Sequence, residues 1–258
     1  MKARQREGWH LVGLALVAAC LFEVFPQLDT WTSSQFYAGA GRFPVDDWAG
    51  VRLIYHAVPW AGRLMVVATL CILLVAWVRQ AWVARWVWRR CAALALSLVL
   101  GLGLVVNGSL KELWGRPRPA QTLEFGGQLP FVPALHPSRV CERDCASFVS
   151  GHAATGFTLI ALGLFARPLV RRRWWWLGIS AGAAIGLVRV AQGRHYASDI
   201  VFGLVVMAGL AWLVREVWMR CMLLRRRRRA APAEMQSSSS QHAQPQLSVD
   251  MQREPHHV

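Results

Sequence analysis

Long apolar runs, separated by basic or polar segments, limit what this chain can fold into more than any other feature. An α-helix needs about 20 apolar residues to cross a bilayer. The apolar runs cover roughly residues 9–28, 60–78, 91–110, 150–166, 174–190 and 196–218, and hydrophobic residues make up 55% of the chain. The sequence therefore predicts an all-α fold, an integral membrane bundle of six transmembrane helices.

Basic residues predict how this bundle is oriented. The formal net charge is +15, but a chain this apolar does not resemble a soluble nucleic-acid binder, so no nucleic-acid partner is expected. Arginines cluster before the first apolar run and after the second, fourth and sixth. Those positions are alternate ends of the spans, so all four clusters share one side, which the positive-inside rule makes cytoplasmic. We therefore expect a multi-pass membrane protein with both termini in the cytoplasm.

The chain is predicted to consist of one membrane domain, residues 1–224, and a cytoplasmic tail, residues 225–258. Five consecutive arginines open the tail, and the rest is rich in Ser, Gln, Pro and His, a composition typical of disorder. The sequence ending at Cys20 resembles a lipoprotein cleavage box. Apolar residues continue beyond it, so the first run is predicted to be a retained helix.

Two cysteines, Cys141 and Cys145, lie in the polar loop between the third and fourth runs. In an oxidising compartment they could form a local disulfide, and two free thiols are the alternative. A zinc site that combines them with His136 lacks an obvious fourth ligand. No metal and no cofactor are therefore predicted.

The first of three polar segments extends from Lys111 to Pro119 and includes Arg116 and Arg118. Arginine binds phosphate oxygens through two parallel hydrogen bonds, and lysine adds a compact positive charge. Such cations stabilise the charge that spreads over a phosphoryl group during transfer. Snorkelling of these side chains to the membrane interface is the structural alternative. Spacing does not decide which of the two arginines points inward.

The second segment contains Ser150, Gly151 and His152, at the predicted start of the fourth membrane helix. Free N–H groups and the helix dipole favour an anion at such a position, and glycine allows close approach. His152 could then protonate a leaving oxygen as a general acid. A serine cap followed by an interfacial histidine is the structural alternative.

The third segment contains Arg189, His195 and Asp199. His195 and Asp199 are four residues apart, so on a helix they would face the same way. The carboxylate could fix the ring tautomer and leave the other nitrogen free as a nucleophile. A turn around Gly193 could bring Arg189 to the same point. A structural His–Asp pair that caps the sixth helix is the alternative.

Taken together, the three segments resemble the signature of the type 2 phosphatidic acid phosphatase and vanadium haloperoxidase superfamily. That signature reads K-x6-R-P, P-S-G-H and S-R-x5-H-x3-D. The matching residues are Lys111, Arg118, Pro119, Ser150, Gly151, His152, Arg189, His195 and Asp199. Val149 and Val188 replace the flanking Pro and Ser of the second and third motifs. The motifs cover roughly residues 107–200.

The resemblance implies a role for each matching residue. His195 would be the nucleophile that forms a phosphohistidine, Asp199 would orient it, and His152 would protonate the leaving group. Phosphate would be held by Lys111, Arg118, Arg189 and the amides near Ser150 and Gly151. The resemblance also implies a metal-free site at the outer, periplasmic face of the membrane, and a lipid phosphate as substrate.

The sequence leaves several alternatives open for the substrate and for the class of reaction. Residues 124–127 and 147–152, with the two loop cysteines, are similar to bacterial members that dephosphorylate lipid A. Undecaprenyl pyrophosphate, phosphatidylglycerol phosphate and phosphatidic acid are further candidates. A phosphotransferase would share the first half of the reaction. A vanadate-dependent haloperoxidase fits the apolar spans poorly, and a transporter or scaffold does not explain why the ionisable residues cluster at one face.

Overall fold

The computed structural model describes residues 2–78, 85–138, 140 and 145–242. Within these ranges the protein is all-helical and has no β-strand. The first half contains α1 (Lys2–Val24), α2 (Gln27–Ser34), the 3-10 turn η1 (Pro44–Asp47), α3 (Ala49–Val78), α4 (Arg85–Leu96), the π-helical η2 (Ser97–Leu110) and α5 (Lys111–Trp114). The second half contains the 3-10 turns η3 (Pro119–Gln121) and η4 (Leu123–Phe125), then α6 (Gly151–Phe157), the 3-10 segment η5 (Thr158–Gly163), α7 (Pro168–Ala191) and α8 (Ala197–His242).

Five helical stretches among the described residues are long and apolar enough to cross a membrane. They are Gln5–Val24, Ala49–Val78, Trp86–Leu110, Pro168–Ala191 and Ala197–Arg225. The expected fourth span, residues 150–166, is formed by the 7 residues of α6 and the 6 of η5. That is shorter than the length a lipid-exposed span needs, so the predicted count of six spans is not confirmed.

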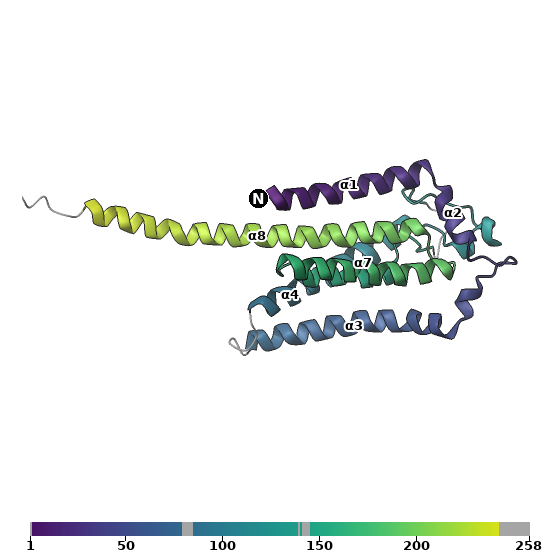
Figure 1. Ribbon diagram of the computed structural model, residues 1–258, viewed down its shortest axis with the longest axis horizontal. Coiled ribbons are helices and arrows are strands. Elements are labelled where there is room, and N and C mark those ends of the chain that lie inside the picture. The colour runs from purple at the N-terminus through teal and green to yellow at the C-terminus, as the bar shows by residue number, and fades with distance from the viewer. Residues whose placement is uncertain (1, 79–84, 139, 141–144, 243–258) are drawn as a thin grey trace, which may run out of the picture. The chain divides into compact units, whose positions relative to one another are not determined.

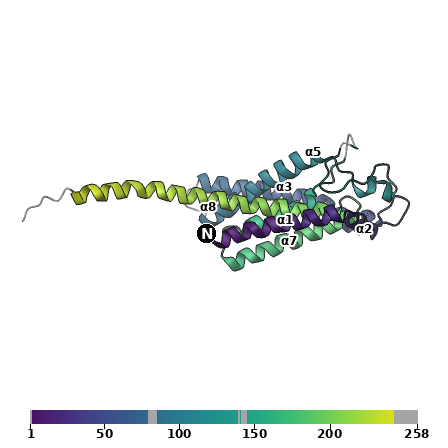
Figure 2. The same ribbon diagram turned by 90° about the horizontal axis from the view of Figure 1, so that it is seen from above.

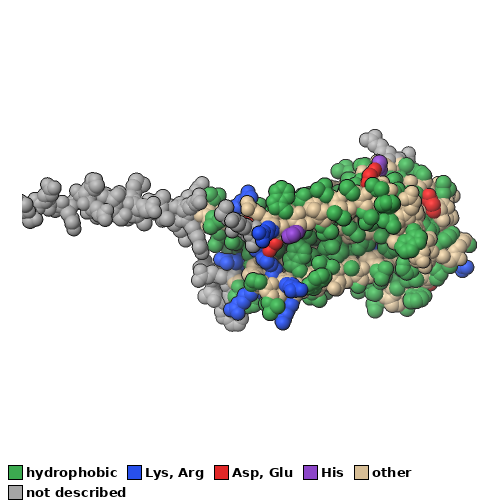
Figure 3. All heavy atoms as spheres, turned by 45° about the horizontal axis from the view of Figure 1, so that its top comes forward, with side chains coloured by type: hydrophobic (Ala, Val, Ile, Leu, Met, Phe, Trp, Pro, Cys, Tyr) green, Lys and Arg blue, Asp and Glu red, His purple; other side chains and the backbone are tan. Residues whose placement is uncertain are grey.

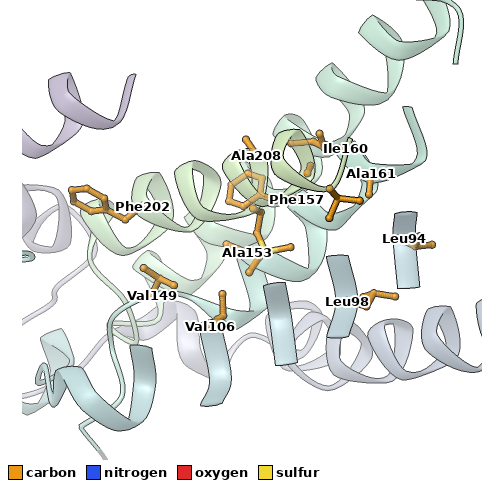
Figure 4. Close-up of a cluster of buried hydrophobic side chains, with 14 of the residues drawn as sticks. Leu94, Leu98, Val106, Val149, Ala153, Phe157, Ile160, Ala161, Phe202 and Ala208 are labelled. Carbon is orange, nitrogen blue, oxygen red and sulfur yellow. The ribbon is translucent and has the colours of Figure 1, made fainter. Parts of the chain in front are cut away.

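Segment α6–η5 is surrounded by protein instead of lipid. Its side chains are almost all buried, and Phe157 and Ile160 are at most 1% exposed. Figure 4 shows these two residues within an extended cluster of buried side chains that also come from α4, η2 and α8. Glycines let α7 approach closely, because a Cβ on Gly182 would lie 2.2 Å from the Phe157 ring. This small-residue contact is typical of helices packed inside membranes.

Helix α3 begins eleven residues before the predicted span, which starts at residue 60. It passes through Pro59 without ending, although proline cannot donate the hydrogen bond that residue 59 would make to the carbonyl of Tyr55. The predicted second span instead began directly after this proline, at residue 60. The extra turns carry Arg52 and Tyr55 towards the loops of the three motifs, where both residues line the cavity described below.

The predicted motif loops gather at one end of the long helices. Figures 1 and 2 show α1, α3, α7 and α8 running alongside one another within residues 1–215, with α2 and the teal loops after α5 at the right-hand end. The starts of α1, α4 and α7, which carry arginine clusters, lie at the opposite end. The arginine clusters and the motifs thus lie at opposite ends of the helices, the arrangement that the positive-inside rule led us to expect.

Apolar side chains cover the outside of the helices. Leu64 of α3, Leu104 of η2 and Leu187 of α7 are 65%, 59% and 59% exposed. On the face shown in Figure 3, hydrophobic side chains extend over the helices, while Lys and Arg gather towards the left-hand end. An apolar surface of this extent indicates contact with a membrane.

The contacts divide the chain into two compact units, Met1–Arg215 and Glu216–Val258. The sequence placed the start of the tail at residue 225, and the backbone of α8 continues as a helix to His242. Residues 243–258, the rest of the predicted tail, lie outside the described residues.

Candidate active site

A cavity of about 440 Å³ opens among the motif loops. It is lined by five of the residues that the sequence singled out: Lys111, Arg118, His152, Arg189 and His195. Its remaining lining residues are Asp46, Asp47, Arg52, Tyr55, His56, Ala146, Gln192 and Arg194. The three motifs therefore meet around one space, and a wall from η1 and the start of α3 completes it.

The third motif reaches the cavity through a turn. Gly193 has φ +64°, and the Arg194 N–H donates to the Arg189 carbonyl at 3.1 Å. This is the turn expected around Gly193, and a Cβ there would lie 2.5 Å from Phe43. His195 precedes α8, which begins at Ala197. The interpretation that His195 and Asp199 share a helix is therefore wrong, and the turn brings them together instead.

Hydrogen bonding selects the tautomer of His195. Its Nδ1 lies 2.8 Å from the Ser147 carbonyl and 3.5 Å from Oδ2 of Asp199. A carbonyl can only accept, so Nδ1 carries the hydrogen in the neutral ring and Nε2 keeps a lone pair. Burial lowers the pKa of His195 below its usual value, although Asp199 opposes this shift. The ring therefore favours its neutral, nucleophilic form.

Asp199 is fully buried behind His195 and does not line the cavity. Its Oδ2 accepts hydrogen bonds from Ser147 Oγ at 2.6 Å and from the Tyr196 N–H at 2.8 Å. Its Oδ1 accepts from Arg116 Nη1 at 2.6 Å. These donors hold the carboxylate in one orientation beside the imidazole.

Arg116, not Arg118, is the arginine whose side chain is buried behind the cavity. It is fully buried, its Nη2 donates to Asp29 Oδ2 at 2.8 Å, and its Nε donates to the Val132 carbonyl at 2.9 Å. Asp29 also accepts from the N–H and hydroxyl of Ser198. The sequence did not identify Asp29, because a single acidic residue after an apolar run carries no motif.

His152 is held by α3. Its Nε2 lies 3.1 Å from the carbonyl oxygen of Tyr55, and its ring stacks on the Tyr55 ring with centroids 5.2 Å apart and planes inclined by 12°. The Arg189 guanidinium lies over the same tyrosine, 4.8 Å from the ring centroid. The sequence did not point to Tyr55, because the second span was predicted to begin only at residue 60.

Three cations of the motifs converge on the cavity. Arg189 is 5% exposed, and its Nη1 donates to Gln192 Oε1 at 2.5 Å. Its buried Nε has no hydrogen-bond partner among the described residues. Gln192 in turn donates to Asp46 Oδ1 at 2.6 Å. Burial, and secondarily Arg118 and Arg189, lowers the pKa of Lys111. The repulsion between these neighbouring positive charges is relieved when an anion binds.

Ser150 and Gly151 lie beside the cavity and shape its surroundings. Ser150 caps α6 by accepting from the Ala153 N–H at 3.4 Å, and its own N–H donates to the Asp199 carbonyl at 3.3 Å. A Cβ on Gly151 would lie 2.9 Å from Lys111 Nζ. Glycine at this position therefore leaves the space that the ammonium group occupies.

Replacing Gly151 with alanine is expected to lower enzymatic turnover by roughly 10-fold, because the added methyl group would push Lys111 Nζ away from its place in the cavity. The lysine side chain is flexible, so unfolding temperature should change little. Steady-state assays and thermal unfolding in detergent check both points, with Gly103→Ala in η2 as a control of the same size. Unchanged activity in Gly151→Ala would contradict this role for the glycine.

Cys141, one of the two loop cysteines, lies outside the described residues, so a disulfide with Cys145 and two free thiols stay the two alternatives.

Comparison with known proteins agrees with the motif resemblance. Residues 92–223 match the PAP2 superfamily. The chain is 30% identical to a lipid A 4'-phosphatase of Francisella tularensis subsp. novicida (strain U112), over 77% of this chain and 90% of the relative. It is 34% identical to a lipid A 4'-phosphatase of Rhizobium leguminosarum, over 76% of this chain and 91% of the relative.

A shorter match, 33% identity over 47% of this chain and 46% of the relative, is to a lipid A 1-phosphatase of Rhizobium johnstonii (strain DSM 114642 / LMG 32736 / 3841). No solved structure matches significantly. The bacterial relatives and the apolar helices together indicate a bacterial membrane protein.

Proposed function

Because the chain belongs to the PAP2 superfamily, we propose that its cavity hydrolyses a phosphate ester of lipid A or of a related envelope lipid, through a phosphohistidine at His195. The observation that carries this proposal is the 2.8 Å contact between His195 Nδ1 and the Ser147 carbonyl, which leaves Nε2 with a lone pair at a cavity that Lys111, Arg118 and Arg189 also line. Relatives named lipid A 4'-phosphatase cover most of the chain and support the substrate class.

In the first step, His195 Nε2 attacks phosphorus, and the bond from phosphorus to the lipid oxygen breaks. His152 gives a proton to that oxygen, which leaves as an alcohol. The His195 ring becomes positively charged as the N–P bond forms. Asp199 and the Ser147 carbonyl stabilise that charge through the Nδ1 hydrogen.

In the second step, water attacks the phosphorus of the phosphohistidine. His152, now neutral, takes a proton from the water, and the N–P bond breaks. Inorganic phosphate leaves, and both histidines return to their starting protonation states. Lys111, Arg118 and Arg189 stabilise the charge on the phosphoryl oxygens in both steps. Ser150 and Gly151 would support these three phosphate-binding cations indirectly, because Ser150 caps α6 and Gly151 leaves space for Lys111.

The membrane arrangement is part of the proposal. We place the cavity at the periplasmic face of the inner membrane, with both termini in the cytoplasm and α6–η5 as a short, protein-enclosed sixth crossing. The arginine-rich starts of α1, α4 and α7, at the end opposite the motif loops, support this orientation.

Purified protein in detergent with EDTA tests the function. Phosphate release is measured from lipid A, undecaprenyl pyrophosphate, phosphatidylglycerol phosphate and phosphatidic acid, with His195→Ala as the blank. We expect release from lipid A that resists the chelator. Loss of release with EDTA would contradict the metal-free steps. Folded protein with no release from any lipid, but transfer to an added acceptor lipid, would identify a phosphotransferase instead.

A further inference from the structure

Helix α3 presents a backbone carbonyl to the active site at a position where its own hydrogen-bond ladder is interrupted. In an α-helix the carbonyl of residue i accepts from the N–H of residue i+4. For Tyr55 that donor would be residue 59, which is proline and has no N–H. The Tyr55 carbonyl instead lies 3.1 Å from His152 Nε2.

We infer that Pro59 and Tyr55 are positioning residues for His152: the proline leaves the Tyr55 carbonyl available, and His152 takes the place of the missing helix donor. This inference rests on the proposed role of His152 as general acid. Pro59 and Tyr55 belong to none of the three motifs.

The arrangement decides which nitrogen of His152 faces the reaction. The Tyr55 carbonyl can only accept, so His152 Nε2 keeps its hydrogen in every protonation state that the reaction uses. Nδ1 is then the nitrogen that gives a proton to the lipid oxygen and later takes one from water. The acid therefore works through a fixed nitrogen, and ring rotation is not required.

The Tyr55 ring limits the remaining freedom of the imidazole. Stacking at 5.2 Å with an inclination of 12° prevents the His152 plane from tilting away from the carbonyl. Arg189 lies over the same ring, 4.8 Å from its centroid, so one residue of α3 touches both the acid and a phosphate-binding cation. Such a support shell keeps reacting groups in productive geometry.

A double-mutant cycle between residues 59 and 152 tests the inference. Turnover of the same lipid substrate is measured for wild type, Pro59→Ala, His152→Ala and the double variant. Alanine restores an N–H that competes for the Tyr55 carbonyl, and it also favours a helix more than proline does. A loss of activity in Pro59→Ala is therefore not caused by a broken helix, and unchanged thermal unfolding would document this.

We expect His152→Ala to lose on the order of 10²-fold or more, as removal of a general acid does, and Pro59→Ala to lose roughly 10-fold. In the His152→Ala background, Pro59→Ala should change turnover by less than about twofold, because its effect passes through the imidazole. Val58→Ala, which alters a neighbouring residue without adding a backbone donor, should retain wild-type turnover.

Three other outcomes of these turnover measurements would each contradict a different part of the inference or of the proposed function. Equal losses from Pro59→Ala in both backgrounds would make the proline a general structural residue, and no loss in either would remove the carbonyl from the mechanism. Full activity in His152→Ala would instead refute the general acid of the proposed function itself.

Discussion

His195→Ala is expected to lower phosphate release by about 10⁴-fold or more, because among the cavity-lining residues that the structure describes only His195 combines a free imidazole nitrogen with a buried carboxylate behind it. Substrate binding should persist, since Lys111, Arg118 and Arg189 remain. Steady-state release and substrate binding, measured on the same preparation, separate the two effects. Because His195→Ala also removes a neighbour of the buried Asp199, thermal unfolding is measured with both assays to separate loss of catalysis from loss of folding.

The covalent intermediate gives this prediction a second readout. Rapid quenching of wild type with a ³²P-labelled lipid substrate should leave label on the protein in an acid-labile, base-stable form. His195→Ala should carry none, and His152→Ala should still form some, since its nucleophile is intact. Label on a carboxylate or serine, or equal labelling in His195→Ala, would assign the nucleophile to another residue.

Arg116→Met is expected to destabilise the protein by about 3–5 kcal/mol, the range seen when one partner of a buried ion pair is removed. The change leaves Asp29 and Asp199 buried without their shared guanidinium, which now lies 2.8 Å from one and 2.6 Å from the other. For a chain of this length such a loss lowers Tm by roughly 10 °C. Thermal unfolding followed through the 14 tryptophans measures it.

Arg118→Met is the matched control for this measurement. The two arginines are separated by one proline, but Arg118 lines the cavity and Arg116 does not. Arg118→Met should therefore lose activity with a much smaller change in Tm. Similar Tm values for the two variants would mean that the buried guanidinium does not hold the core of the site together.

The sequence predicted the groups that line the cavity because short motifs keep a fixed spacing within one segment. Lys111, Arg118, His152, Arg189 and His195 were all identified in this way, and all five line one cavity. Spacing could not choose between Arg116 and Arg118. That choice depends on Asp29, which lies 87 residues from Arg116 along the chain and reaches it only in the folded bundle.

Hydropathy predicted the long helices because a lipid-exposed segment must be apolar along its whole length. It could not predict that α3 continues through Pro59, since proline reads as a helix boundary in a single sequence. Nor could it distinguish a lipid-facing span from α6–η5, whose apolar residues are buried against α7 and α8. Tyr55 was missed because α3 was expected to begin after Pro59. The count of six spans rested on reading the buried segment α6–η5 as a lipid-facing span.

The hydrogen bonds between Asp29 and Ser198 join positions 169 residues apart. During synthesis, α1 and α2 emerge from the ribosome long before the start of α8. Until that last helix arrives, Asp29 lacks Ser198, Arg116 lacks Asp199, and His195 has no settled tautomer. A nascent chain halfway through insertion thus carries Lys111 and Arg118, the proposed phosphate-binding cations of the first motif, without the proposed nucleophile in place. Competence to hydrolyse lipid therefore requires the start of the final helix to be in place.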